Sequence, residues 1–216
     1  MRIVSLCPKS IQHLGMTPPV LNFWFEFAST YSYPAMMRIT SLADAAGIAL
    51  KFRPFLLGPV FKAQGWETSP FNLYVSKGRN MWRDLERLCE ELKLPFRRPE
   101  PFPQNSLQAS RLALVGLDAQ WGEDFCRSVF RAEFAEGRRI DDPAVLSELL
   151  AELRVDPHPV LAAAQTDAIK TKLRSQTEEA LQLGIFGAPS FITMDGELFW
   201  GNDRLERAIA WARTAR

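Results

Sequence analysis

A strand, a helix and a second strand follow one another early in the chain, and this order restricts the fold more than any other feature. The run Asn22–Phe27 is short and rich in aromatic residues, which is typical of a buried strand. A helix expected over Tyr33–Ala46 ends at Gly47, a residue suited to the left-handed end of a helix. A second strand is expected over Ile48–Pro54. Because a helical crossover joins parallel strands, the chain begins an α/β sheet here.

The middle of the chain has helical periodicity with marked boundaries. Asp142-Pro143 combines a helix cap with proline at the first helical position, and the proline-rich stretch Leu94–Pro103 cannot be helical. The helices expected from the pattern cover Ser76–Leu92, Ser106–Gln120, Gly122–Ala135, Asp142–Leu153 and Asp156–Leu183, the last with a break near Thr166.

The end of the chain returns to strands. Strands are expected over Ser190–Met194 and Glu197–Trp200, joined by a two-residue hairpin turn at Asp195-Gly196, before a final helix over Asp203–Ala212. The order β-α-β, helical segment, helix-β-β-α predicts an α/β protein with a thioredoxin-like fold and a large all-helical insertion domain.

This order of elements also predicts domain boundaries. The thioredoxin-like domain is expected to consist of residues 21–56 and 184–216, with the helical insertion over 57–183. Residues 1–20 are expected to form a leader that is not part of the fold, with Met16 as an alternative natural start.

Composition and charge exclude several classes of function. The chain has 216 residues, and its 26 Lys and Arg residues nearly balance 25 Asp and Glu residues, which gives a net charge of +1. No general electrostatic attraction to nucleic acid or to an anionic membrane is expected from this balance. No apolar stretch has the length of a membrane span, so we expect a cytoplasmic protein.

Cysteine and histidine are too few and too scattered for the usual catalytic or metal-binding patterns. Cys89 and Cys126 lie at helical spacing among apolar residues, so each is expected in the core, and Cys7 has no strand before it or helix after it. The only histidines, His13 and His158, have no nucleophile in a suitable context. We therefore expect neither a metal site nor a nucleophile supplied by the protein.

Two serines mark the junction between the first strand and the first helix. Ser29 and Ser32 lie where the first turn of the helix has unpaired N–H groups, a position that favours an anion. Helix capping by either serine is the alternative explanation.

Three stretches of the sequence resemble one known family. FWFEFASTYSYP, GIFGAPSF and WGNDRLE are similar to kappa-class glutathione transferases and to 2-hydroxychromene-2-carboxylate isomerases of the DsbA-like thioredoxin superfamily. The similarity covers about residues 21 to 214. Where the superfamily's oxidoreductases carry Cys-x-x-Cys, this chain has Ser29-Thr30-Tyr31-Ser32, with Thr30 in place of the family's usual proline. Disulfide chemistry of the protein itself is therefore excluded at this position.

The resemblance implies that glutathione is the co-substrate and supplies the missing thiol. Its sulfur would lie beside Ser29, whose hydroxyl and the nearby helix N-terminus would favour the thiolate. Its cysteinyl peptide unit would pair with the backbone of Ala188, which precedes Pro189 at the expected start of a strand. A proline that only marks this start is the structural alternative.

The two ends of glutathione require charged and polar partners. Asp203 can accept from the γ-glutamyl ammonium, and Asn202 and the start of the last helix can bind its carboxylate. Lys77 lies where the family has a lysine for the glycyl carboxylate, and Asn72 is the nearest match to the family's asparagine. A plain helix cap at Asn202-Asp203 and a solvated helix start at Lys77 remain the alternatives.

The second substrate is expected in the cleft between the sheet domain and the helical insertion. The aromatic side chains expected to line this cleft are Tyr31, Phe61, Trp66, Trp82 and Phe186. Such residues suit a flat aromatic electrophile, although large aromatic side chains at helical spacing are more often part of a core.

Three functions remain after these observations. The first is a glutathione-dependent isomerase of the 2-hydroxychromene-2-carboxylate type, and the second is a kappa-like glutathione transferase that uses the same residues. The third is a non-catalytic thioredoxin-fold module that binds peptides across Pro189. The family also implies a homodimer.

Overall fold

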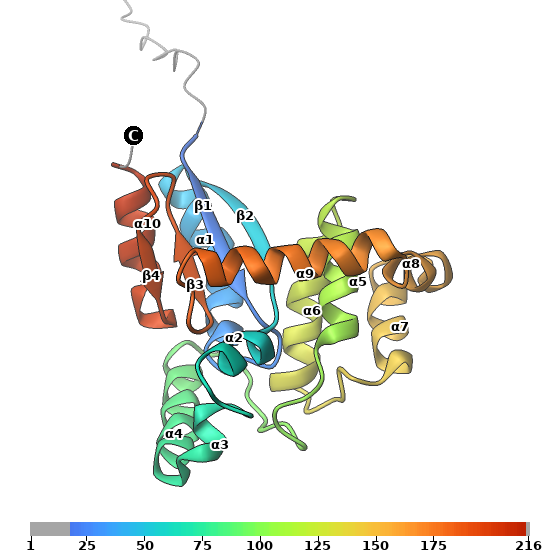
Figure 1. Cartoon of the computed structure of the whole chain (residues 1–216), viewed down its shortest axis with the longest axis horizontal. Coiled ribbons are helices and arrows are strands. Elements are labelled where there is room, and N and C mark those ends of the chain that lie inside the picture. Colours follow the sequence, from blue (N-terminus) through green and yellow to red (C-terminus); the bar gives the residue numbers. More distant parts are fainter. Residues whose placement is uncertain (1–17, 215–216) are drawn as a thin grey trace, which may run out of the picture.

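A computed structural model describes residues 18–214, and Figure 1 shows a small sheet with helices on both of its faces. In chain order the elements are β1 (Val20–Phe25), α1 (Ser32–Ala46), β2 (Ala49–Pro54), α2 (Leu57–Ala63), α3 (Pro70–Leu73), α4 (Val75–Glu91), α5 (Leu107–Leu117), α6 (Gly122–Phe134), α7 (Pro143–Glu152), α8 (Pro157–Ala164), α9 (Asp167–Gln182), β3 (Ser190–Ile192), β4 (Leu198–Trp200), the 3-10 helix η1 (Asn202–Arg204) and α10 (Leu205–Ala212).

The sheet has the strand order β2-β1-β3-β4 and joins the two ends of the chain. β1 pairs with β2 in parallel and with β3 antiparallel, and β4 pairs antiparallel with β3. Phe23 on β1 lies opposite Phe52 on β2 and Phe191 on β3. This arrangement confirms the α/β class and the thioredoxin-like fold with its helical insertion.

Alternating side chains of β1 bury against different helices on the two faces of the sheet. Phe23 and Phe25 belong to the large core that includes α1, α10 and the helices α5 to α7, and Phe25 packs 6.0 Å from the ring of Phe130 on α6. Trp24 points the other way and packs with Phe55 and with Ala180 of α9. In Figure 1, α9 accordingly crosses one face of the sheet while α1 lies behind it.

The expected helix break near Thr166 is confirmed. α8 ends at Ala164, and the Thr166 hydroxyl caps the next helix by accepting from the Ile169 amide. From there α9 runs without interruption from the helical region to the sheet, where Gln176 donates to the Pro54 carbonyl at 2.5 Å. α9 lies within the expected insertion and packs against the sheet, and the division of the chain at residues 57–183 stays a prediction.

The hairpin between β3 and β4 differs from the sequence-based expectation. Thr193 pairs with Glu197, so the loop has three residues, Met194 to Gly196, instead of two. The Gly196 amide donates to the Thr193 carbonyl, and Gly196 has a φ of 87°. The loop is therefore a turn that ends in a left-handed residue. The extra residue shortens both strands.

The described residues, 18–214, include two of the three cysteines. Cys89 and Cys126 are buried in the core, as expected, whereas Cys7 and Met16 lie outside the described residues. Between residues 18 and 214, no helix is long and apolar enough to cross a membrane.

Candidate active site

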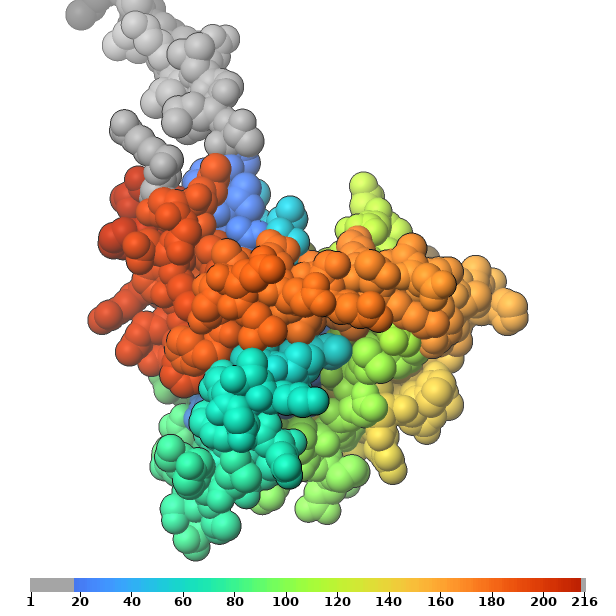
Figure 2. Space-filling model, viewed as in Figure 1, coloured from blue at the N-terminus to red at the C-terminus, as the bar shows by residue number. Residues whose placement is uncertain are grey.

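A cavity of about 1280 Å³ opens at one end of the sheet. It is lined by the loop between β1 and α1, helices α2 to α4, the segment before α5, and the loops that precede β3 and follow β4. Figure 2 shows the α2 to α4 segment, in teal and green, as a lobe at the lower edge of the molecule. The cavity therefore lies where the two halves of the fold meet the start of the helical region.

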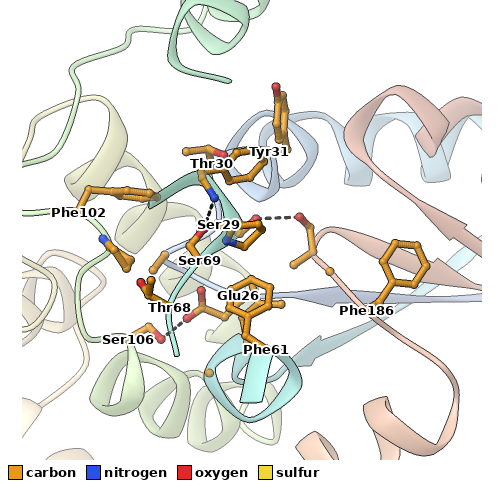
Figure 3. Close-up of a pocket in the computed structure, with 18 of the residues that line it drawn as sticks. Glu26, Ser29, Thr30, Tyr31, Phe61, Thr68, Ser69, Phe102, Ser106 and Phe186 are labelled. Atoms are coloured by element: carbon orange, nitrogen blue, oxygen red, sulfur yellow. Dashed lines mark hydrogen bonds between the residues drawn. The ribbon is translucent and has the colours of Figure 1, made fainter. Parts of the chain in front are cut away.

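Ser29 lies on the wall of this cavity, before the first turn of α1. Its hydroxyl donates to the Ala188 carbonyl at 2.9 Å, as the dashed line from Ser29 in Figure 3 marks, and its amide donates to the Glu26 carbonyl at 3.0 Å. Capping is not its role, because within the described chain no side chain caps α1, and the Ser32 hydroxyl is buried without a hydrogen-bond partner.

The strand-to-helix junction and the loop before β3 are in direct contact. The Ala188-Pro189 peptide bond is cis, and the Ala188 carbonyl that accepts from Ser29 lines the cavity. Pro189 itself lies just before β3 and does not line the cavity. The sequence-based pairing of these two distant segments is thus present in the fold.

Asn202 and Asp203 lie at the start of the last helical segment, and both line the cavity. Asn202 is buried, and its side-chain oxygen accepts from Arg38 of α1 at 3.0 Å. The Asp203 carboxylate pairs with the neighbouring Arg204 guanidinium at 2.6 Å. This corner of the cavity therefore carries one acid, which is paired with Arg204.

Lys77 and Asn72 have different positions. Lys77 lines the cavity from α4, with its ammonium 4.7 Å from the centre of the Tyr74 ring. Asn72 is exposed on α3, donates to the Thr68 hydroxyl at 3.2 Å, and is not among the lining residues. The short helix α3 turns Asn72 away from the cavity, so the structure does not support its expected contact with a ligand.

Four of the five expected aromatic residues line the cavity. These residues are Tyr31, Phe61, Trp66 and Phe186. Trp82 does not line the cavity as predicted. It is only 8% exposed and packs 4.7 Å from the ring of Phe102, inside the core. It follows the buried stripe of α4 with Met81 and Leu85, and this periodicity is the same signal that marks core residues.

Comparison with known proteins identifies the family. A model of the DSBA-like thioredoxin domain matches residues 20–209. The chain belongs to this family. It is 30% identical over 200 residues to 2-hydroxychromene-2-carboxylate isomerase of Pseudomonas sp. (strain C18), which covers 89% of this chain and 91% of that protein.

Two further comparisons agree with this assignment. The chain is 28% identical to glutathione S-transferase kappa 2 of Caenorhabditis elegans, over 86% of this chain and 88% of that protein. A solved structure of 2-hydroxychromene-2-carboxylate isomerase superposes with a TM-score of 0.76 at 27% identity, over 89% of this chain and 93% of that one. This member of the DSBA-like family therefore has relatives that are enzymes of the two types expected from its sequence.

The sequence reasoning missed an acid in the cavity of this DSBA-like domain. Glu26 lines the cavity although it is only 5% exposed, and the Ser106 hydroxyl before α5 donates to its carboxyl group. Burial raises the pKa of Glu26 from its ordinary value to about 7. The signal was present, because a charged residue interrupts an aromatic strand run.

Tyr31 joins the start of α1 to α4 across the mouth of the cavity. Its hydroxyl donates to the Asp84 carboxylate at 2.8 Å. Burial and this hydrogen bond raise the pKa of the Tyr31 hydroxyl, so it stays protonated at neutral pH. Tyr31 therefore acts as a hydrogen-bond donor and not as a base.

Proposed function

We propose that this protein is a glutathione-dependent cis–trans isomerase of the 2-hydroxychromene-2-carboxylate type, acting on an aromatic pyruvate-like substrate. The thiolate of bound glutathione is the nucleophile in this proposal. The observation that supports it most is the hydrogen bond from the Ser29 hydroxyl to the Ala188 carbonyl on the cavity wall.

This hydrogen bond suits an exchange of partners when glutathione binds. The N–H of the cysteinyl residue of glutathione donates to the Ala188 carbonyl, as in strand addition. The Ser29 hydroxyl, released from that carbonyl, then donates to the sulfur and stabilises its anionic form. Ser29 thus stabilises the thiolate and does not itself attack the substrate.

The two charged ends of glutathione are assigned to opposite sides of the cavity. The γ-glutamyl group binds Asn202 and Asp203, where a carboxylate faces the ammonium. The glycyl carboxylate binds Lys77 on α4. Asn72 is omitted from this scheme because its side chain is exposed on the outer side of α3.

In the proposed reaction, the thiolate adds to a conjugated carbon of the substrate and converts a double bond into a single bond. The single bond rotates, the carbon–sulfur bond breaks, and glutathione leaves unchanged. The aromatic walls at Phe61, Trp66 and Phe186 suit a flat substrate. The similarity to a kappa-class transferase favours one second candidate, in which glutathione stays attached to the product.

Measuring the consumption of glutathione tests the proposal. The protein is incubated with glutathione and either aromatic pyruvates or standard electrophiles, and substrate and free thiol are followed together. Conversion of substrate at constant thiol supports the isomerase, and equal loss of both supports the transferase. A protein that a glutathione resin fails to retain, and that converts neither substrate class, would contradict both activities.

A further inference from the structure

Glu26 forms a buried acidic floor in a cavity that is lined by both aromatic and polar side chains. The residue follows β1 directly, and Figure 3 shows its carboxyl group turned toward Ser106, in the same cavity as Ser29 and Phe61. Only 5% of Glu26 is exposed, so its carboxyl group is held by its surroundings and not by bulk water.

The burial of Glu26 favours its neutral form. Burial raises the pKa of its carboxyl to about 7, while the Ser106 hydroxyl and the Ala28 amide act in the opposite direction. From α6, Glu133 is also fully buried, and within residues 18–214 its two oxygens have no hydrogen-bond partner. Burial raises the pKa of Glu133 well above its ordinary value, and the charges of Glu26 and Asp141 add to this, so the neutral form of Glu133 is favoured as well.

No basic side chain compensates these two acids. Among the salt bridges within residues 18–214, none involves Glu26 or Glu133. From α2, the side that faces the floor is the apolar ring of Phe61. A ligand carboxylate placed at the floor would therefore meet an acid without a neighbouring cation, which is unfavourable.

A neutral Glu26 has one hydrogen bond to give. A protonated carboxyl carries one O–H donor and an acceptor oxygen. The Ser106 hydroxyl and the Ala28 amide both donate to the carboxyl group, so the O–H of its protonated form is the one donor available to a ligand in the cavity. The cations that line the cavity, Lys77 and Arg87, lie on α4 and not at the floor.

We propose that the floor of the cavity is a subsite for a neutral hydrogen-bond acceptor on an aromatic substrate, such as a ketone or phenol oxygen, which the Glu26 carboxyl binds as donor. An anionic group of the same substrate then lies toward Lys77 and Arg87. The assignment of this cavity to the second substrate rests on the proposed function, whereas the donor role of Glu26 can be measured without glutathione.

Binding of two aromatic probes tests this subsite. Acetophenone carries a neutral ketone and benzoate a carboxylate, and their affinities are measured by equilibrium dialysis at pH 6 and pH 8 without glutathione. With a pKa of about 7, the protonated fraction of Glu26 falls about tenfold over this interval, and the acetophenone affinity should fall with it. The benzoate carboxylate is assigned to Lys77 and Arg87, so the affinity of benzoate should depend less on pH than that of acetophenone.

Variants identify the group responsible for the pH dependence. Glu26→Gln keeps a neutral donor at every pH, so its acetophenone affinity should be equal at pH 6 and pH 8. Glu67→Gln is the matched control, because Glu67 lines the same cavity but is exposed, and it should behave like the wild type. Ser106→Ala removes a hydrogen bond that favours the ionised form, so its loss of affinity should move to higher pH.

The outcomes separate this inference from the proposed function. A wild-type affinity that does not change with pH, a Glu26→Gln variant that loses affinity like the wild type, or no detectable acetophenone binding would each overturn it. If Glu26→Gln does not fold, an unshifted profile in Ser106→Ala overturns it instead. Because the assay contains no glutathione, failure of the protein to bind glutathione leaves these results unaffected.

Discussion

The single hydrogen bond of the Ser29 hydroxyl determines what its removal should do. Ser29→Ala should leave glutathione affinity largely unchanged, because the contacts proposed for Ala188, Lys77 and Asp203 remain. The pKa of the bound thiol should rise by about one to two pH units, because a charge-assisted hydrogen bond is worth roughly 1.5–3 kcal/mol. The measurement is the absorbance of the bound thiolate as a function of pH.

A neighbouring serine provides the control for this experiment. Ser32 is buried on α1 and its hydroxyl makes no hydrogen bond within the described residues, so Ser32→Ala should leave the thiolate profile unchanged. Identical profiles and equal turnover for wild type and Ser29→Ala would refute the assigned role.

The two described cysteines are expected to be chemically inert. Burial raises the pKa of the Cys89 thiol to about 11 and also raises the pKa of the Cys126 thiol, so neither forms a useful thiolate at neutral pH. A double Cys89→Ala and Cys126→Ala variant should keep glutathione-dependent turnover. It should lose roughly 1–3 kcal/mol of stability through the small cavities left in the core. Urea unfolding and turnover are measured on the same sample, and a folded variant without activity would show that a protein nucleophile had been missed.

At the scale of elements, the link between β4 and η1 shapes the corner proposed to bind the γ-glutamyl group. Gly201 has a φ of 106°, and a Cβ atom there would lie 2.6 Å from the Asp203 carboxylate oxygen. Gly201→Ala should therefore cost about 1–3 kcal/mol in stability through backbone strain. It should also weaken glutathione binding, because Asp203 must move. Calorimetric titration with glutathione measures this second effect.

The turn between β3 and β4 offers a matched comparison. Gly196 also has a positive φ, 87°, but a Cβ atom there would have no neighbour within 4 Å. Gly196→Ala should show a similar loss of stability with unchanged glutathione affinity. Equal affinities of both variants would remove the proposed role of this corner.

Over the whole molecule, the buried acids make stability depend on pH in an unusual direction. Glu26 keeps its proton in the folded state up to a pKa of about 7, whereas the unfolded chain loses it near the ordinary value. Between these values only the folded state binds the proton, so stability falls as pH rises, by about 3 kcal/mol in total. This contribution is fully present below the unfolded pKa and is lost above pH 7.

Urea unfolding at pH 5 and pH 8 tests this dependence. The difference between the two pH values should be smaller in Glu26→Gln than in the wild type, because its side chain does not ionise, while the contribution of the buried Glu133 is present in both proteins. The acids with lowered pKa, Asp141 and Asp195, titrate at lower pH and are common to both proteins, so they do not affect the comparison. An equal pH dependence in the wild type and the variant would contradict the assignment.

Local signals in the sequence were sufficient for most of the fold. Periodicity and caps identified the βαβ start, the strands at the end of the chain and the helix break at Thr166, because these depend on residues close in sequence. The order of elements predicts that the junction at Ser29 lies near the loop that contains Ala188, and in the structure a hydrogen bond joins these two residues.

Only the tertiary structure decided which way individual side chains face. Trp82 lies in the core and Asn72 on the surface, and Glu26 reaches Ser106 across 80 positions of sequence, because each of these depends on packing between distant segments. The hairpin at Gly196 gained a residue for the same reason, since its length follows from the register of β4 against β3. The sequence by itself determined the order of elements and the position of Ser29 between the first strand and the first helix. Packing between distant segments determined which side chains line the cavity and that Glu26 is buried at its floor.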